Sequence, residues 1–132
     1  IYGSMQTKKK FGKEITNLTS VLNGATPIAC NNEHFGRAEN ILAPGTGKNM
    51  GDGWETRRSR GKNFDWLIIK CATAGRIGKI QIDTHHFKGN YPDKCSLQAA
   101  YINSKISIKG RKGWIISISS DGATSFHEFI IF

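Results

Sequence analysis

The sequence predicts an all-β fold, an antiparallel sandwich of short strands. Segments rich in β-branched and aromatic residues recur along the second half of the chain, and turns containing Gly, Asn, Asp and Pro separate them. Several segments alternate apolar and polar residues, as Ile80 and Ile82 do with Gln81 and Asp83. No long amphipathic helix accompanies these segments, and in such sandwiches the functional loops gather at one end.

The first part of the chain predicts a short lead-in and a few small elements. We expect a flexible basic segment over 1–14, followed by a single domain over 15–132. Within this domain, 15–25 suits a short helix or turn and 26–30 suits a strand. The next elements are a short amphipathic helix over 34–42 and a glycine-rich loop over 43–53.

The remaining elements are predicted to be strands. Two of them show an alternation that assigns Trp66, Ile68, Ile80 and Ile82 to the core, on neighbouring strands. The expected strands cover 64–72, 78–84, 95–102, 105–110, 113–120 and 124–132.

The chain is strongly basic, with 19 Lys and Arg residues against 10 acidic residues and a formal net charge of +9. Such a charge attracts anions, whether a small carboxylate, a nucleic acid or a membrane surface. Much of the excess lies in runs near the two ends, within 8–10 and 105–112, which is typical of solvated surface. Because no nucleic-acid motif and no membrane-length apolar run is present, we expect neither of those partners.

Three cysteines, Cys30, Cys71 and Cys95, show no paired spacing. Their odd number argues against a disulfide framework, and the lack of a CxxC motif argues against a thiolate metal site. Buried thiols in a reducing compartment are the simplest interpretation, and with no secretory leader pattern they predict a cytoplasmic protein. Because the chain starts at Ile1 rather than Met, we expect a fragment of a longer protein.

Two polar segments are the strongest candidates for a functional site. MGDGWETRRSR (50–60) joins acids to arginines, and DTHHFKGN (83–90) carries two adjacent histidines and a lysine at the end of a strand. Histidine suits proton transfer near neutral pH, and Glu55 or Asp83 could orient His86 or act beside it. An arginine fork suits a carboxylate. We expect residues 43–60 and 84–94 to lie at the same end of the sandwich.

Simpler interpretations apply to several of these residues. Trp54 is more typical of core packing than of a ligand platform, and exposed arginines are commonly plain surface. His34, Glu55, Asp83 and His86 could supply a nitrogen and oxygen metal site, but no ligand spacing supports one, so metal binding stays open. GTGK (45–48) lacks the Ser or Thr that follows the lysine of a phosphate loop, so no phosphate loop is predicted.

Long motifs in the chain resemble the allantoicase family over about residues 17–101. They are ACNNEHFG (29–36), AENILAPG (38–45), MGDGWETRRSR (50–60), DWLIIK (65–70), GRIGKIQIDT (75–84), HFKGN (86–90) and CSLQAA (95–100). The resemblance is to one repeat of a two-repeat enzyme, closer to the second, and implies a jelly-roll fold of the galactose-binding-like type. It also implies hydrolysis of allantoate to ureidoglycolate and urea in purine degradation, with no cofactor.

The resemblance further implies a set of site residues and partners. It implies catalytic roles for Glu55, Asp83 and His86, and pairing with a second repeat, with assembly into a homo-oligomer. The substrate-binding residues that it implies are His34, Asp52, Arg57, Arg58, Thr84, Lys88 and Asn90.

Some positions depart from the family pattern. CATA (71–74) stands where a Leu-Gly turn is usual, Phe64 stands where a His is usual, and the match weakens from Ile102 onward. Two alternatives therefore accompany the enzyme hypothesis. One is a non-catalytic module that binds a carbohydrate or another ligand, since this fold type often does so, and the other is an inactive single-repeat fragment. A basic nucleic-acid binder would rest on charge alone.

Overall fold

The computed structural model describes residues 15–58, 64–102, 113–121, 125–126 and 128–131. The predicted lead-in over 1–14 and the predicted strand over 105–110 lie outside the described residues. In the described part, short 3-10 helices accompany the strands, and no helix there is long and apolar enough to cross a membrane. The elements are η1 (Val21–Asn23), β1 (Thr26–Cys30), η2 (Ala38–Leu42), η3 (Met50–Asp52), β2 (Trp54–Glu55), β3 (Phe64–Lys70), β4 (Ile80–Asp83), β5 (Cys95–Ile102), β6 (Gly113–Asp121), β7 (Ser125–Phe126) and β8 (Glu128–Ile131).

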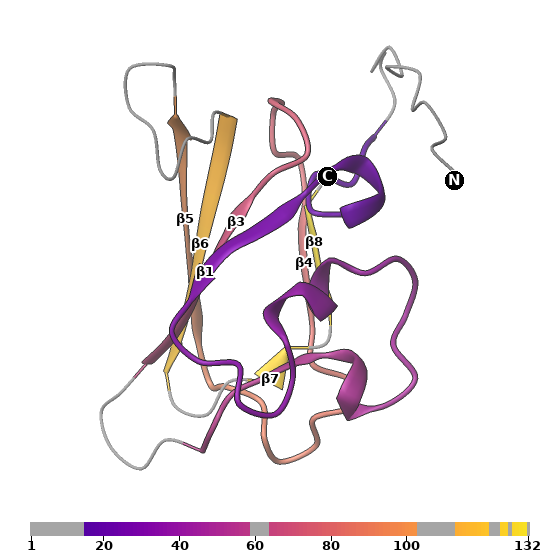
Figure 1. Ribbon diagram of the computed structural model, residues 1–132, viewed down its shortest axis with the longest axis vertical. Coiled ribbons are helices and arrows are strands. Elements are labelled where there is room, and N and C mark those ends of the chain that lie inside the picture. Colours follow the sequence, from indigo (N-terminus) through magenta and orange to yellow (C-terminus); the bar gives the residue numbers. More distant parts are fainter. Residues whose placement is uncertain (1–14, 59–63, 103–112, 122–124, 127, 132) are drawn as a thin grey trace, which may run out of the picture.

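All strand pairs that the structure describes are antiparallel, which confirms the predicted all-β class. The largest sheet has four strands in the order β1-β3-β6-β5, and β4 pairs with β8 while β2 pairs with β7. Figure 1 shows the β4–β8 pair beside the large sheet, with β7 near the lower end of the molecule. Ile82 of β4 packs against the core cluster to which Leu67 and Ile69 of β3 belong.

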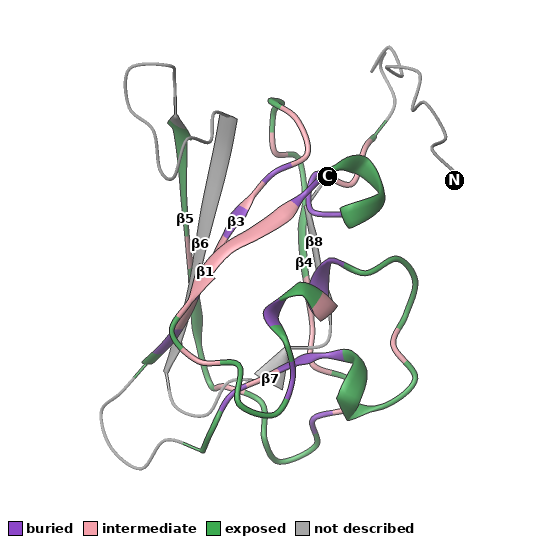
Figure 2. Cartoon of the chain, viewed as in Figure 1, coloured by how far each residue is buried: buried purple, intermediate pink, exposed green. Residues whose placement is uncertain are grey.

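The centre of the core is built by residues of β3, η2 and β2. Leu67 and Ile69 of β3, Ile41 and Leu42 of η2, and Trp54 of β2 are all at most 1% exposed. They belong to one cluster, and Figure 2 colours the buried stretches of the chain purple. Trp54 is therefore a core residue, as predicted, and it fixes the end of η3 against the sandwich.

The predicted core face of β3 is wrong. Trp66 and Ile68 are half-buried, whereas their neighbours Leu67 and Ile69 are fully buried. FDWLIIK carries large apolar residues on both faces, so alternation alone does not decide which face points inward. The buried carboxylate of Asp65, on the same face as Leu67, decides which face of β3 points inward.

Asp65 is buried because two side chains satisfy its carboxylate. Thr56 donates its hydroxyl to Oδ2 at 2.6 Å, and Asn31 donates its Nδ2 to Oδ1 at 2.9 Å. The Oδ1 of Asn31 also accepts the backbone amide of Trp66 at 2.8 Å, which extends the strand contact past β1. A buried carboxylate is tolerated only with such partners, and they join the segment after β2 to β3.

β4 only partly follows the prediction. Ile82 is half-buried and packs against the core, as expected, but Ile80 is 40% exposed. The expectation that the strands of Trp66 and Ile82 are neighbours is also wrong, because β4 pairs with β8 and not with β3. Sequence periodicity sets the face of a strand but not its partner, and the partner here lies far along the chain.

The predicted helix over 34–42 is shorter and tighter than expected. Only Ala38–Leu42 is helical, and it is a 3-10 helix. Gly36 instead pairs with Glu55 in an isolated antiparallel bridge, which requires extended backbone. A Cβ atom at position 36 would lie 2.4 Å from the carbonyl oxygen of Gly53, so only glycine fits this approach.

The three cysteines differ in their surroundings. Cys71 is buried, as predicted, and Cys30 is half-buried, but Cys95 is exposed, so the prediction of buried thiols is wrong for Cys95. Cys95 is the first residue of β5, which the sheet order places at an edge of the four-stranded sheet, where one side lacks a described neighbour.

Cys71 is expected to make stability fall at alkaline pH. Burial raises the pKa of its thiol from 9.0 to about 11. A raised folded-state pKa contributes stability that is complete below pH 9.0 and is lost as the pH rises toward about 11. Urea unfolding of the wild type and Cys71→Ala at pH 8 to 11 should show a smaller alkaline decline in the variant. An identical decline in both proteins would contradict this assignment.

Candidate functional site

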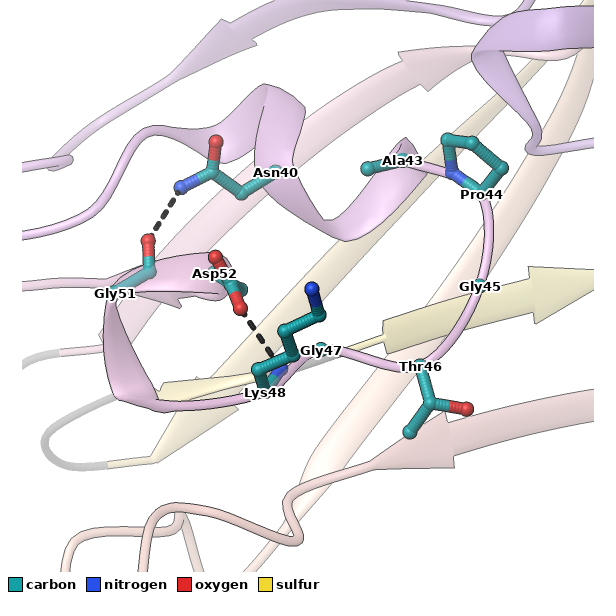
Figure 3. A pocket seen from close by; sticks show the side chains of 9 residues that line it. All are labelled: Asn40, Ala43, Pro44, Gly45, Thr46, Gly47, Lys48, Gly51 and Asp52. Atoms are coloured by element: carbon teal, nitrogen blue, oxygen red, sulfur yellow. Dashed lines mark hydrogen bonds between the residues drawn. The ribbon is translucent and has the colours of Figure 1, made fainter.

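A polar pocket of about 330 Å³ lies in the glycine-rich loop between η2 and β2. Figure 3 shows this loop curving around the space, with η2 above it and η3 at one side. The lining residues combine one acid, one cation, an amide, a hydroxyl and several glycines: Asn40, Ala43, Pro44, Gly45, Thr46, Gly47, Lys48, Gly51 and Asp52. A small polar molecule is the kind of ligand that such a lining suits.

Hydrogen bonds from side chains to backbone hold the loop in shape. Asn40 of η2 donates its Nδ2 to the carbonyl oxygens of Gly51 at 3.2 Å and Gly53 at 3.1 Å. The carboxylate of Asp52 accepts the backbone amide of Lys48 at 2.8 Å. Asn49 accepts the amide of Gly51 at 2.8 Å and begins η3. These are local turn and cap contacts that Asn and Asp side chains commonly make.

The second predicted segment meets this loop through His86. Its Nε2 lies 2.9 Å from the carbonyl oxygen of Gly47, a residue of the pocket wall. A carbonyl only accepts, so the hydrogen is on Nε2 in this contact. The contact brings the described part of the first segment, 43–58, next to the segment over 84–94, as the sequence predicted.

The side chain of Phe87, the residue after His86, anchors the loop that carries both. Phe87 is fully buried, and its backbone amide donates to the carbonyl of Thr84 at 3.0 Å. Asp83 accepts the amide of His85 at 2.7 Å, and the amide of Asn90 donates to Phe87 at 3.0 Å. The burial of Phe87 therefore sets where His86 lies, while Lys88 and Asn90 are exposed beyond it.

The other predicted residues lie along the same loops without lining the pocket. Glu55 is half-buried on β2, three residues after η3 ends. His34 is exposed, and its ring packs edge-on against Phe35 with centroids 4.5 Å apart. Arg57 and Arg58 are both exposed. Of the ten predicted site residues, the structure joins Asp52 and His86 most directly, through Lys48 and Gly47 of one wall.

Metal ligation receives no support from the predicted set. Among the residues that the structure describes, no three His, Cys, Asp or Glu side chains gather closely enough to hold a metal ion. His34, Glu55, Asp83 and His86 are all described, so they do not form the four-ligand group that the sequence left open.

The sequence did not point to Lys48 and Asn40 as site residues. GTGK was tested only against the phosphate-loop motif, which it fails. A usable signal was nevertheless present, since a lysine between glycines and a capping Asn, in a loop that must lie at the end of a sandwich, is placed to meet a ligand.

The antiparallel all-β architecture, with a polar pocket in one of its loops, is consistent with a galactose-binding-like fold. The family model described as the allantoicase repeat matches residues 16–129. The chain belongs to the allantoicase family.

Individual relatives agree with this membership. The chain is 56% identical to a probable allantoicase of Photobacterium profundum over 86 residues, which is 65% of this chain and 26% of that protein. It is 58% identical to a probable allantoicase of Burkholderia mallei over 86 residues, again 65% and 26%. The matches thus span about a quarter of the length of the curated relatives.

Solved structures of the family share the fold. The crystal structure of an allantoicase from Saccharomyces cerevisiae superimposes with a TM-score of 0.73 at 28% identity, covering 88% of this chain and 42% of that one. A second allantoicase structure gives a TM-score of 0.72 at 29% identity, with 87% and 42% covered. The chain therefore corresponds to less than half of each solved protein.

Proposed function

We propose that this chain is a functional repeat of an allantoicase that hydrolyses allantoate to ureidoglycolate and urea, in purine degradation. The observation that carries the proposal is the meeting of the two polar segments at one pocket, through the 2.9 Å contact between His86 and Gly47. Family membership supplies the substrate, and the polar lining of the pocket suits a small molecule with ureido and carboxylate groups.

The reaction requires proton transfers at one carbon. The bond between the central carbon of allantoate and one ureido nitrogen breaks, a water oxygen bonds to that carbon, and the departing nitrogen gains a proton. We assign these transfers to His86 with Glu55 or Asp83. Arg57 or Arg58, with Lys88, would bind the carboxylate. Asp52, Thr84, Asn90 and His34 would hold the ureido groups.

The proposal includes a partner. A domain over 15–132, of the jelly-roll type, would pair with a second repeat of the same family in a cytoplasmic enzyme that assembles as a homo-oligomer. The support is the length of the relatives, since the chain covers 42% of the solved allantoicase from Saccharomyces cerevisiae. Neither a nucleic acid nor a membrane is part of the proposal, and no cofactor is assigned.

Urea release tests the function directly. The chain alone, and the chain joined to a second allantoicase repeat, are incubated with allantoate, and both urea and ureidoglycolate are measured. Equal amounts of the two products above the uncatalysed rate support the proposal. Binding of allantoate without turnover in either form would favour the ligand-binding module, and neither binding nor turnover would reject an allantoate site.

A further inference from the structure

Lys48 is the cation in the wall of the pocket described above. Figure 3 shows its side chain extending into the space between Asp52 on one side and the Ala43–Pro44 turn on the other. In the part of the chain that the structure describes, the recorded ion pair joins Arg37 to Glu39 at 3.2 Å, and Lys48 takes part in none. Its ammonium group therefore faces the pocket without a carboxylate partner among those residues.

The backbone of Lys48 is fixed even though its side chain is exposed. Its amide donates to the Oδ2 of Asp52 at 2.8 Å, and the preceding residue, Gly47, accepts from His86 at 2.9 Å. The Cα atom of Lys48 thus lies between two anchored groups. A cation on an anchored backbone loses less freedom when it binds a ligand than one on an unanchored loop.

Three further residues of the pocket wall bring backbone amides to this loop. Gly45, Thr46 and Gly47 line the pocket, and none of their amides donates a hydrogen bond to another residue that the structure describes. Gly45 has φ of 83°, in the left-handed region that favours glycine. Unsatisfied amides beside an ammonium group are the donors with which proteins bind carboxylates and other small anions.

We propose that Lys48 anchors the carboxylate of the substrate and makes the pocket selective for ureido acids over their neutral analogues. The proposal rests on the proposed function and deepens it. It moves the carboxylate from Arg57 or Arg58 to Lys48, because Lys48 lines the pocket and neither arginine does. Asp52 lies on the side of the Lys48 ammonium that faces away from the Ala43–Pro44 turn. It is then placed to accept ureido N–H groups.

The test compares a charged probe with a neutral one on the full 132-residue chain. Ureidoacetate and its amide, ureidoacetamide, are titrated into the wild type, Lys48→Met and Lys79→Met, with affinity read by calorimetry and by amide NMR shifts. Lys79 is the matched control because it is also exposed but does not line the pocket. We expect Lys48→Met to weaken ureidoacetate binding by about tenfold and to leave ureidoacetamide unchanged.

The outcomes distinguish failure of the proposed role of Lys48 from failure of the proposed allantoate hydrolysis. Equal affinity for ureidoacetate in the wild type and Lys48→Met, no binding of ureidoacetate at all, or an equal loss for both probes overturns the role of Lys48. Lys48-dependent binding of ureidoacetate supports it, even if urea release from allantoate fails. A third result is urea release with unchanged affinity in Lys48→Met and weaker binding in Arg57→Ala or Arg58→Ala. It would show that an arginine, and not Lys48, binds the carboxylate.

Discussion

His86→Ala is expected to lower the turnover of allantoate by about 10²–10⁴-fold, the usual scale for loss of an acid–base residue. The measurement is steady-state kinetics on the form of the protein that releases urea. The fold should survive, because the buried anchor of this loop is Phe87 and not His86. The loss should appear mainly in kcat, since proton transfer acts in the transition state.

Two further variants separate proton transfer from loop positioning. His86→Gln retains an N–H donor that can reach the carbonyl of Gly47 but cannot exchange a proton near neutral pH. Loss of turnover in both variants supports proton transfer, whereas recovery in His86→Gln would show that His86 only positions the pocket wall. His85→Ala is the matched control, because His85 is an exposed neighbouring imidazole, and it should remain near the wild type.

Trp54→Ala is expected to cost about 3–5 kcal/mol of unfolding free energy, the range for a fully buried tryptophan. Trp54 is 0% exposed, and its Nε1 donates to the carbonyl of Asn32 at 2.8 Å. The variant therefore leaves both a cavity and a carbonyl, on the half-buried Asn32, that lacks this donor. Urea denaturation of the two proteins measures the loss.

Trp66→Ala is the comparison that makes the Trp54 result specific. Trp66 has the same side chain but lies on the half-buried face of β3, outside the core cluster. It should lose clearly less stability than Trp54→Ala. Equal losses at the two positions would mean that both faces of β3 are packed alike and that the face assignment is wrong.

Much of the architecture could be predicted because local sequence determines it. β1 and β5 begin and end where β-branched residues and turns indicated, and Trp54 is buried as its residue type suggested. The core face of β3 could not be predicted, because apolar residues occupy both faces and the decision depends on Asp65. Its partners, Thr56 and Asn31, approach from 9 and 34 residues away.

The sequence predicted the location of the candidate site better than it predicted which residues line the pocket. Local chemistry pointed to His86, Glu55, Asp83 and the arginines, and the family pattern supplied Asp52 and the rest of the list. Lys48 was missed because its surroundings resemble a failed motif, and only the fold shows that it faces a pocket. The contact of His86 with Gly47 spans 39 residues and involves a backbone carbonyl, which no side-chain pattern encodes.

The contact of His86 with the carbonyl of Gly47 has a consequence for which pocket residues can vary. The fixed points of the pocket loop are the Asn40 contacts, the tie between Lys48 and Asp52, and the contact of His86 with the main chain of Gly47. Every residue type possesses a carbonyl oxygen, so His86 places no demand on the side chain at position 47. Positions 46 and 47 can therefore change side chain, and with it ligand preference, without loss of the His86 contact, whereas Gly45, with φ of 83°, is restricted to glycine.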